Sequence, residues 1–360
     1  MALPFLLKNN LRKRTYSHEK IDKDFKHAVL DKYGANYHLD AKKKILIFST
    51  QIDTETDEMG VHFLSNGIDY DRINDNDISE GFFSFTINYN DTAVQIILKD
   101  NRSNIEFNLD DYDYIWFRHF SIDMYSQKNM STYEQIYYEQ EWKAVISSIP
   151  QLYPNKVSMP SISDGFLLKP YQLKLAKEAG FNLIPTVISN DFNKVKYFSE
   201  QSDKNIVKAI CHHMFFINNN NLVEFNTKNF AQLNNEDKKF ISEVPAIYQP
   251  NYLNSDSKEI RVTVFGKRMI AYKYTNYFGK DWHSQLKELN VKKVDLPNNI
   301  QKSIQYFFEK AKITFGTVDF IIKDNCWYYL ETNVNGDWAW LENLANTSFA
   351  NLLISTLLEI

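Results

Sequence analysis

The sequence predicts an α/β (α+β) fold that begins with a parallel sheet and ends with antiparallel sheets. Residues 44–49 (KILIFS) have the apolar character of a buried strand, a helical stretch follows, and residues 68–74 (IDYDRIN) form a second strand. Strand, helix and strand in succession indicate a parallel pair. Near the other end of the chain, apolar strands at 317–323 and 327–332 flank a tight turn at Asp324 and Asn325, which indicates an antiparallel hairpin.

A first α/β domain is expected over residues 44–155. Its first helix is capped by Asp53 or Thr54 and ends near 66–67. Its further elements are strands at 82–88, 93–99, 104–108 and 113–118, and an amphipathic helix at 131–148.

A central region over residues 156–245 and a C-terminal region over residues 246–360 complete the main fold. Their expected helices are 170–179, one from 190 or 191, 228–242, 281–290, 298–312 and 344–358. Their expected strands are 184–188, 205–211, 246–253, 259–265 and 269–274, with a hairpin at 214–227. Residues 1–43, with a short helix at 22–33, are predicted to be an extension outside this fold.

Three oxygen-bearing side chains interrupt the C-terminal hairpin. Glu331 and Asn333 lie two residues apart, so they share one face of an extended strand. A three-residue loop centred on Asn325 would place Asp319 directly opposite Glu331. Two such carboxylates repel each other unless a cation joins them, and these oxygen ligands suit Mg²⁺ completed by phosphate oxygens. The alternative is a pair of acids that face solvent at a sheet edge.

Composition excludes several classes of protein. The 360 residues are 44% hydrophobic, enough for a large core or for two or three domains, and the net charge of −4 argues against a general nucleic-acid binder. Two cysteines, Cys211 and Cys326, provide neither a disulfide framework nor a zinc site. The sequence shows no membrane-length apolar run and no signal peptide, so a cytoplasmic protein without a membrane partner is expected.

Three cations have a sequence setting that suits phosphate. Lys169 lies just before a helix, Lys208 lies inside the apolar strand NIVKAI, and Arg261 lies in KEIRVTVFG. A charge in a buried strand needs an anionic partner, and a guanidinium binds phosphate or carboxylate through two parallel hydrogen bonds. Each cation alone is better explained as a surface residue whose stem packs on a sheet. Their order, Lys, Lys, Arg, then Asp and Glu-x-Asn, indicates a site for nucleotide and metal.

With these residues in this order, the chain resembles the ATP-grasp ligases, and among them the peptide maturases that make graspetides (microviridin-type and grasp-with-spasm systems). The resemblance covers about residues 44–360. It rests on KILIFST, IWFRH, LKPYQLKLAKEAGFNLIPTVISND, NIVKAI, KEIRVTVFG, GTVDFI and, most specifically, YYLETNVNGDW.

The resemblance implies a role for each candidate residue. The residues expected to contact ATP are Lys169, Lys208, Tyr248, Gln249 and Arg261. Arg261 is expected to hold the γ-phosphate and the acyl-phosphate intermediate, and the backbone near Tyr248 and Gln249 is expected to contact adenine. The ligands expected for Mg²⁺ are Asp319, Glu331 and Asn333. Two departures stand out: AICHHMFF after Lys208 lacks the glycines of the usual phosphate-covering flap, and Val334 follows Asn333 where proline is common.

A precursor peptide, with a leader and a core, is the partner that the resemblance implies. The leader is expected to dock beside the hairpin at 214–227. The residues expected to contact the peptide are Phe215, Ile217, Leu222, Val223, Phe225, Arg118, His212 and His213. Residues 4–7 (PFLL) resemble the aromatic Pro-Phe-Phe knot of microviridin-type leaders. Residues 1–43 are therefore either a leader-like segment joined to the enzyme or an unrelated extension.

The implied reaction uses ATP to phosphorylate an Asp or Glu side chain of the peptide. A Ser or Thr hydroxyl or a Lys amine then displaces phosphate and closes an ester or amide macrocycle. The resemblance also implies a homodimer. Two alternatives remain open: a ligase of the ribosomal-modification (glutamate-adding) type that acts on a small molecule or protein terminus, and a nucleotide-binding sensor without catalysis. Retention of the metal ligands together with Arg261 argues against the sensor.

Overall fold

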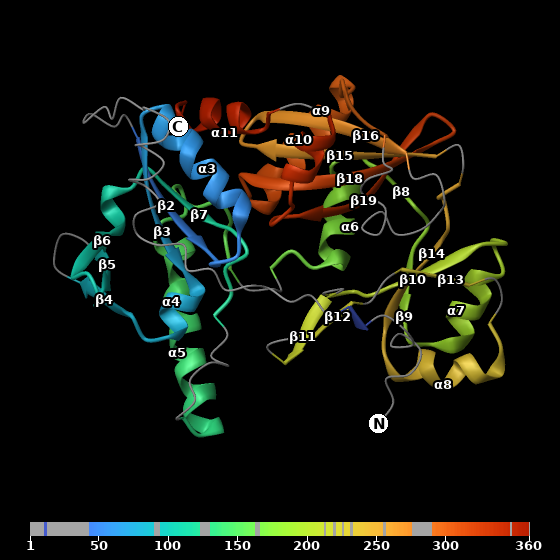
Figure 1. Ribbon diagram of the computed structural model, residues 1–360. Coiled ribbons are helices and arrows are strands. Elements are labelled where there is room, and N and C mark those ends of the chain that lie inside the picture. The colour runs from blue at the N-terminus through green and yellow to red at the C-terminus, as the bar shows by residue number, and fades with distance from the viewer. Residues whose placement is uncertain are drawn as a thin grey trace.

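The computed structural model describes residues 11–12, 43–89, 94–122, 130–162, 166–211, 214–218, 221–224, 227–230, 233–254, 257–275, 290–345 and 348–359 (Figure 1). The expected helix at 22–33 and residues 281–289 of the expected helix at 281–290 lie outside the described residues, and Asn290 begins a strand. None of the helices within the described ranges is long and apolar enough to cross a membrane.

The first unit contains the predicted parallel sheet. Its strands are β3 (Ile68–Asn74), β2 (Lys43–Ser49) and β7 (Tyr114–Phe117), in that order, and both pairings are parallel. The connecting helix α3 (Thr54–Ser65) begins after Asp53, whose carboxylate accepts a hydrogen bond from the backbone N–H of Thr56. The predicted strand, helix and strand are therefore confirmed, with Asp53 as the cap.

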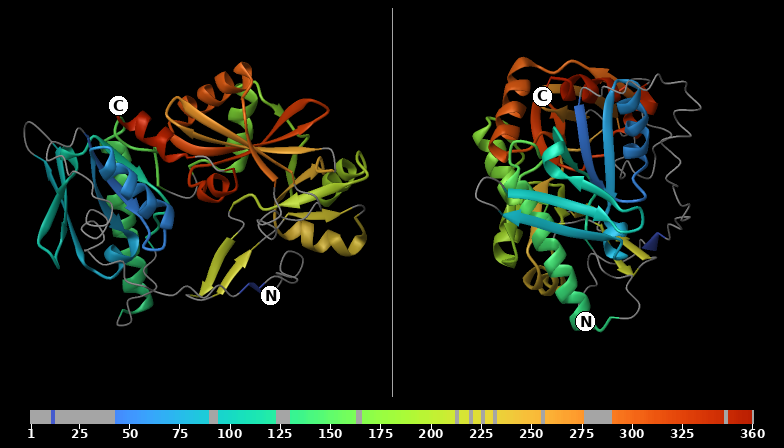
Figure 2. Two further views of the ribbon diagram at one scale, coloured as in Figure 1. Left: turned by 45° about the horizontal axis from the view of Figure 1, so that its top comes forward. Right: turned by 90° about the vertical axis from the view of Figure 1, so that its left-hand side faces the viewer.

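An antiparallel sheet and a long helix complete this unit (Figure 2). The sheet contains β4 (Phe83–Tyr89), β5 (Val94–Asp100) and β6 (Ile105–Asn108). Helix α4 (Asp75–Ser79) precedes it, and helix α5 (Thr132–Leu152) follows, starting at a capping box made by Ser131 and Glu134.

A four-stranded antiparallel sheet forms the central unit, with the strand order β13-β10-β14-β9. These strands are β13 (Lys228–Phe230), β10 (Asn205–Lys208), β14 (Ala246–Pro250) and β9 (Val187–Ser189), and helices α7 (Phe192–Ser199) and α8 (Asn235–Glu243) accompany them. The prediction of one helix over 228–242 is wrong at its start, because residues 228–230 pair with β10. Helix α8 begins only after Asn234, which forms a capping box with Asp237.

A six-stranded sheet forms the C-terminal unit. Its strands are, in order, β17 (Asn290–Val294), β16 (Arg268–Thr275), β15 (Lys258–Phe265), β18 (Phe315–Lys323), β19 (Cys326–Asn333) and β8 (Asn182–Leu183). Only the pairing of β8 with β19 is parallel. Helices α6 (Lys169–Glu178) and α9 (Asn298–Ala311) share a hydrophobic core with this sheet. The expected single helix at 344–358 is instead two helices, α10 (Ala339–Ala345) and α11 (Ala350–Leu357), and the buried Phe349 directly precedes the second.

The two large hydrophobic cores each join the first unit to the C-terminal sheet. One includes Ile146 of α5 and Val262 of β15, and the other includes Trp116 of β7 and Phe315 of β18. The central sheet has a separate small core around Val195 and Tyr248. The first unit and the C-terminal unit therefore pack together as one body, and the central sheet faces the C-terminal sheet (Figure 1).

The predicted hairpin after β10 lies apart from the central sheet and from the C-terminal sheet in two views (Figures 1 and 2). Its strands are β11 (Met214–Asn218) and β12 (Asn221–Glu224). A short strand β1 (Leu11–Arg12) pairs antiparallel with β12, where Leu11 is opposite Val223 and Arg12 is opposite Leu222. A segment far away in the sequence thus forms the third strand of this small sheet.

Candidate active site

The β18–β19 hairpin brings Asp319 and Glu331 directly opposite each other, as predicted. The expected three-residue loop is wrong, however. Asp324 and Asn325 form a two-residue turn in which both have positive φ (51° and 60°), and the register shifts between Asp319 and Phe320. This β-bulge adds one residue to β19 and so restores the predicted pairing.

Arg261 extends this row of charges across the sheet. It is the cross-strand partner of Asp319, on β15. Its Nε and Nη2 donate to the two carboxylate oxygens of Asp319, each at 2.8 Å, and both side chains are less than 10% exposed. Burial alone would lower the pKa of Arg261, but Asp319 raises it, so the guanidinium stays charged. This geometry is the bidentate fork that recognises carboxylate or phosphate.

Two lysines approach Glu331 from different elements. Lys169, the first residue of α6, places its Nζ 3.3 Å from Glu331 Oε2. Lys208, the last residue of β10, interacts electrostatically with Glu331 from the central sheet. Burial by itself raises the pKa of Glu331, but Lys169, Lys208 and Arg261 outweigh it and hold this pKa at about 2. Burial lowers the pKa of Lys208, and the nearby charge of Lys169 lowers it further.

Gln172 holds this arrangement together, and sequence reasoning missed it. Its Nε2 donates to the backbone oxygens of Leu167 (2.8 Å) and Thr332 (2.9 Å). Its Oε1 accepts from the backbone N–H of Thr332 (2.8 Å) and the hydroxyl of Tyr329 (2.9 Å). One buried amide thus uses four hydrogen bonds to tie α6, which carries Lys169, to the strand that carries Glu331. Its position three residues after Lys169 was the available signal, because that spacing shares a helix face.

The expected Mg²⁺ ligands supply a suitable donor set. Asp319, Glu331 and Asn333 offer two carboxylates and an amide oxygen from neighbouring strands. Within the described residues, no group of three His, Cys, Asp or Glu side chains is placed to hold a metal by itself. The donors therefore fit Mg²⁺ that keeps phosphate or water oxygens, rather than a closed protein cage.

The segment after Asn333 packs closely on β18. Asn333 Oδ1 accepts a hydrogen bond from the backbone N–H of Asn335 at 2.9 Å. A Cβ at Gly336 would lie 2.1 Å from Thr317 Oγ1, so only glycine permits this approach. Glycine at this position lets the segment after Asn333 pack directly against Thr317 of β18.

Tyr248 and Gln249 lie inside β14, which pairs with strands on both sides. Both side chains are buried, and Gln249 Nε2 donates to Thr186 Oγ1 at 2.9 Å. The strand ends at Pro250, earlier than the expected residue 253. A backbone contact to adenine in this region stays a prediction.

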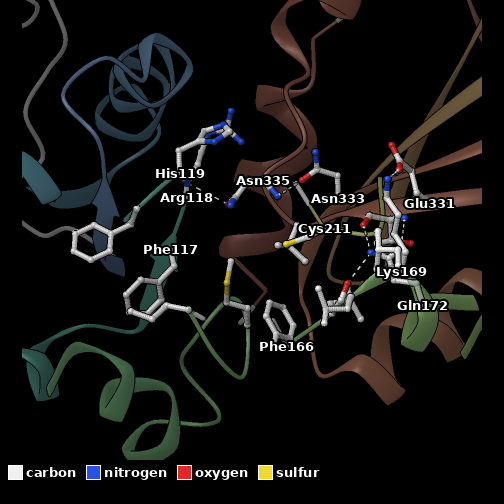
Figure 3. Close-up of a pocket in the computed structure, with 18 residues that line it drawn as sticks. Phe117, Arg118, His119, Phe166, Lys169, Gln172, Cys211, Glu331, Asn333 and Asn335 are labelled. Atoms are coloured by element: carbon white, nitrogen blue, oxygen red, sulfur yellow. Dashed lines mark hydrogen bonds and ion pairs between the residues drawn. The ribbon is translucent and has the colours of Figure 1, made fainter. Parts of the chain in front are cut away.

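A pocket of about 340 Å³ opens beside the charged row. Figure 3 shows Lys169, Gln172 and Glu331 on one side, Arg118 and His119 on the other, and Asn333 and Asn335 between them. Apolar residues such as Phe117 and Phe166 line the remainder. The charged row and an apolar wall thus share one opening.

The residues expected to contact peptide are distributed between the pocket and the hairpin. Phe215 and Ile217 belong to β11, Leu222 and Val223 belong to β12, and Arg118 lines the pocket. His212, His213 and Phe225 lie outside the described residues. The guanidinium of Arg118 is fully buried and contacts the carboxylates of Asp53, Glu55 and Asp337. These peptide contacts stay predictions.

Comparison with solved structures identifies the fold. The chain is similar to the Chryseobacterium gregarium RiPP-associated ATP-grasp ligase in complex with ADP and a leader and core peptide (TM-score 0.71, 19% identity, 88% of this chain and 96% of that chain). It is also similar to macrocyclase MdnC bound with precursor peptide MdnA from Microcystis aeruginosa MRC (TM-score 0.72, 16% identity, 88% and 100%). The chain has the ATP-grasp fold. A third structure with this fold, the ATP-grasp ligase PsnB complexed with minimal precursor, Mg and ADP, has a TM-score of 0.68 at 14% identity and covers 89% and 99%. No family model and no curated protein matches the sequence.

Proposed function

We propose that this chain is an ATP-dependent ligase that forms ester or amide macrocycles in a precursor peptide. It activates Asp or Glu side chains as acyl phosphates, and a hydroxyl or amine then displaces the phosphate. The observation that carries the proposal is the convergence of five charged side chains within an ATP-grasp fold: Lys169, Lys208, Arg261, Asp319 and Glu331. Lys169 and Glu331 also line the pocket.

The roles of these residues follow from the demands of phosphoryl transfer. The reaction needs reactants held in line and negative charge neutralised, and little covalent chemistry from the protein. Lys169 and Lys208 bind phosphate oxygens. Arg261, which Asp319 holds through Nε and Nη2, donates from its guanidinium to the γ-phosphate and to the acyl phosphate. Asp319, Glu331 and Asn333 would hold Mg²⁺, which when bound neutralises phosphate charge.

The peptide substrate is favoured over a small molecule by the comparison structures. The three structures named above contain a precursor, or a leader and core peptide. A glutamate-adding ligase would use the same ATP residues and differ only in its substrate surface. The test is ADP formation with and without the peptide encoded by a neighbouring short reading frame rich in Ser, Thr, Lys, Asp and Glu. Mass spectrometry should show loss of one water per ring, and stimulation by free amino acids instead would favour the alternative.

A leader-like role for residues 1–43 is the second part of the proposal. Strand β1 already pairs with the hairpin edge at β12, which provides main-chain hydrogen bonds to an added strand. Residues 1–43 contain ten Lys or Arg and five Asp or Glu, a net +5, which leaves −9 for residues 44–360. Opposite charge therefore also favours docking.

Tethering makes such a weak contact effective. Residues 13–42 connect β1 to β2, and a tether of about this length gives an effective concentration of about millimolar. Deletion of residues 1–42, which leaves β2 complete from Lys43, should lower cyclisation of a core peptide, and the free segment added in trans should restore it. Leu11→Pro, which removes a backbone hydrogen-bond donor from β1, should lower cyclisation more than Leu11→Ala does. Equal activity of the deletion and the full chain, with no stimulation by the free segment, would show an unrelated extension.

We also propose that the protein is a homodimer. Static light scattering at assay concentration measures this directly. A mass equal to one chain would contradict it.

A further inference from the structure

His119 occupies the side of the pocket opposite Lys169 and Glu331, and none of the roles above uses it (Figure 3). Its side chain is 34% exposed, and its Nε2 lies 2.9 Å from Asp337 Oδ1. Nδ1 lies on another side of the ring and has no hydrogen-bond partner among the described residues. A general base is often an imidazole in which one nitrogen is hydrogen-bonded to a carboxylate and the other nitrogen is available to accept a proton.

Asp337 is itself held in place by a buried cation. Arg118 Nη2 lies 2.9 Å from the same Oδ1 atom. The pKa of Asp337 would rise through burial alone, but the hydrogen bond from His119 and the charge of Arg118 lower it to about 2. Asp337 is therefore a carboxylate at any working pH, able to orient the imidazole and to stabilise its protonated form.

The chain around Asp337 is anchored to the first unit. Glu55 Oε1 accepts hydrogen bonds from the backbone N–H groups of Trp338 (3.0 Å) and Ala339 (2.8 Å). The Arg118 guanidinium also stacks over the Trp338 ring, 4.3 Å from its centre. These contacts fix the position of Asp337 relative to His119, although the two residues lie 218 positions apart.

The backbone of His119 has a strained conformation and is hydrogen-bonded to the loop that leads to Asp337. Its φ of 51° lies in the left-handed region, which is unfavourable for a residue with a Cβ. Its N–H donates to Asn335 Oδ1 at 3.2 Å, and Asn335 in turn binds Asn333. Strain of this kind persists where the surroundings enforce it, often at functional sites. The loop that carries the expected metal ligand thus also sets the direction of His119.

We propose that His119 is the general base that accepts the proton of the acceptor hydroxyl or amine, and that Asp337 is its positioning residue. This rests on the proposed function. The acceptor O or N bonds to the acyl carbon while its proton passes to His119 Nδ1. The bond from that carbon to the phosphate oxygen breaks, and phosphate leaves with the electron pair. The charges that face His119 are Asp337, Arg118 and Asp53 on its own side of the pocket, and Lys169 and Glu331 across it.

Hydroxylamine separates the two halves of the reaction. It traps the acyl phosphate as a hydroxamate without needing a base, so hydroxamate reports activation and ring closure reports the acceptor step. The full chain is assayed with precursor peptide, ATP and Mg²⁺. His119→Gln should lower ring closure by about 100-fold or more, the usual contribution of a general base. Hydroxamate formation should stay within about threefold of the unaltered chain, and the same change at the exposed His62 should alter neither.

Asp337→Asn tests the positioning role of Asp337. It should lower ring closure, while hydroxamate formation stays within about threefold of the unaltered chain. A purely structural role would lower both to the same extent. Equal loss of hydroxamate and ring closure in His119→Gln would overturn the proposal, since it would indicate a role in binding or folding. Unchanged ring closure would overturn it as well. Absence of hydroxamate and ADP in the unaltered chain would instead refute the proposed function.

Discussion

The ion pair between Arg261 and Asp319 should hold the C-terminal sheet together as well as serve catalysis. Two parallel 2.8 Å hydrogen bonds join the two side chains, and both are less than 10% exposed. Removal of one partner leaves the other as an unpaired buried charge, which costs about 3–5 kcal/mol. Arg261→Ala and Asp319→Ala should each lower the melting temperature by roughly 10 °C.

The double variant measures the coupling. With both charges removed, no unpaired charge remains, so its loss of stability should be smaller than the sum by about 2–3 kcal/mol. Arg268→Ala is the control, because Arg268 forms an ion pair with Glu359 in which both side chains are exposed (39% and 65%). The control variant should lose less than about 1 kcal/mol of its free energy of unfolding. Thermal and urea unfolding of the four variants supplies these values.

Activity gives an independent reading of the same site. Arg261→Lys keeps the charge and the fold but loses the fork. Its turnover, measured as ADP formation, should fall by about 100-fold, while nucleotide affinity changes much less. The reasoning fails if Arg261→Ala is no less stable than Arg268→Ala and the double variant is additive. Lost nucleotide binding with intact turnover of bound ATP would contradict the catalytic role.

Three further changes test the rest of the site. Glu331→Gln should abolish Mg²⁺-dependent ADP formation and leave the fold intact. The control is Glu178→Gln, which removes a charge from a surface ion pair with Lys174 and should not change ADP formation. Undiminished ADP formation in Glu331→Gln would refute the metal assignment. The pKa of Glu331 falls from 4.5 to about 2 on folding, so its contribution to the free energy of unfolding is present above pH 4.5 and lost as pH falls toward 2. Between pH 4.5 and pH 2, Glu331→Gln should therefore lose less of its free energy of unfolding than the unaltered chain does. Lys208→Ala should raise the apparent KM for ATP and lower turnover, and normal kinetics would mean that the lysine only packs. Gln172→Leu should lower the free energy of unfolding by about 2–4 kcal/mol and reduce turnover, because several buried polar groups lose their partners; unchanged unfolding would show that its bonds are dispensable.

Much of the charged row was predictable because it depends on local patterns. The period-two spacing puts Glu331 and Asn333 on one face, and the apolar strands specify a hairpin. The pairing of Asp319 with Glu331 was predicted correctly from a loop that is wrong, since a two-residue turn and a bulge produce the same register. A bulge depends on the neighbouring strands and leaves no clear signal in the sequence.

Local reasoning also failed where distant chain segments compete with helix propensity. Residues 228–230 have a helical pattern in isolation but pair with β10 in the central sheet. The C-terminal segment forms two helices, α10 and α11, although its run of apolar residues suggests a single helix. Tertiary pairing outweighs local preference because each buried backbone group must find a hydrogen-bond partner.

The sequence by itself determined the order of strands and helices, the caps, and the identity of the cations and carboxylates. Only the tertiary structure decided how they combine. Gln172 reaches Thr332 across 160 positions, Glu55 reaches Trp338 across 283, and His119 reaches Asp337 across 218. Side-chain periodicity reports which face of an element is buried, but not which other element covers it. These contacts arise because the two shared cores pack the first unit against the C-terminal sheet.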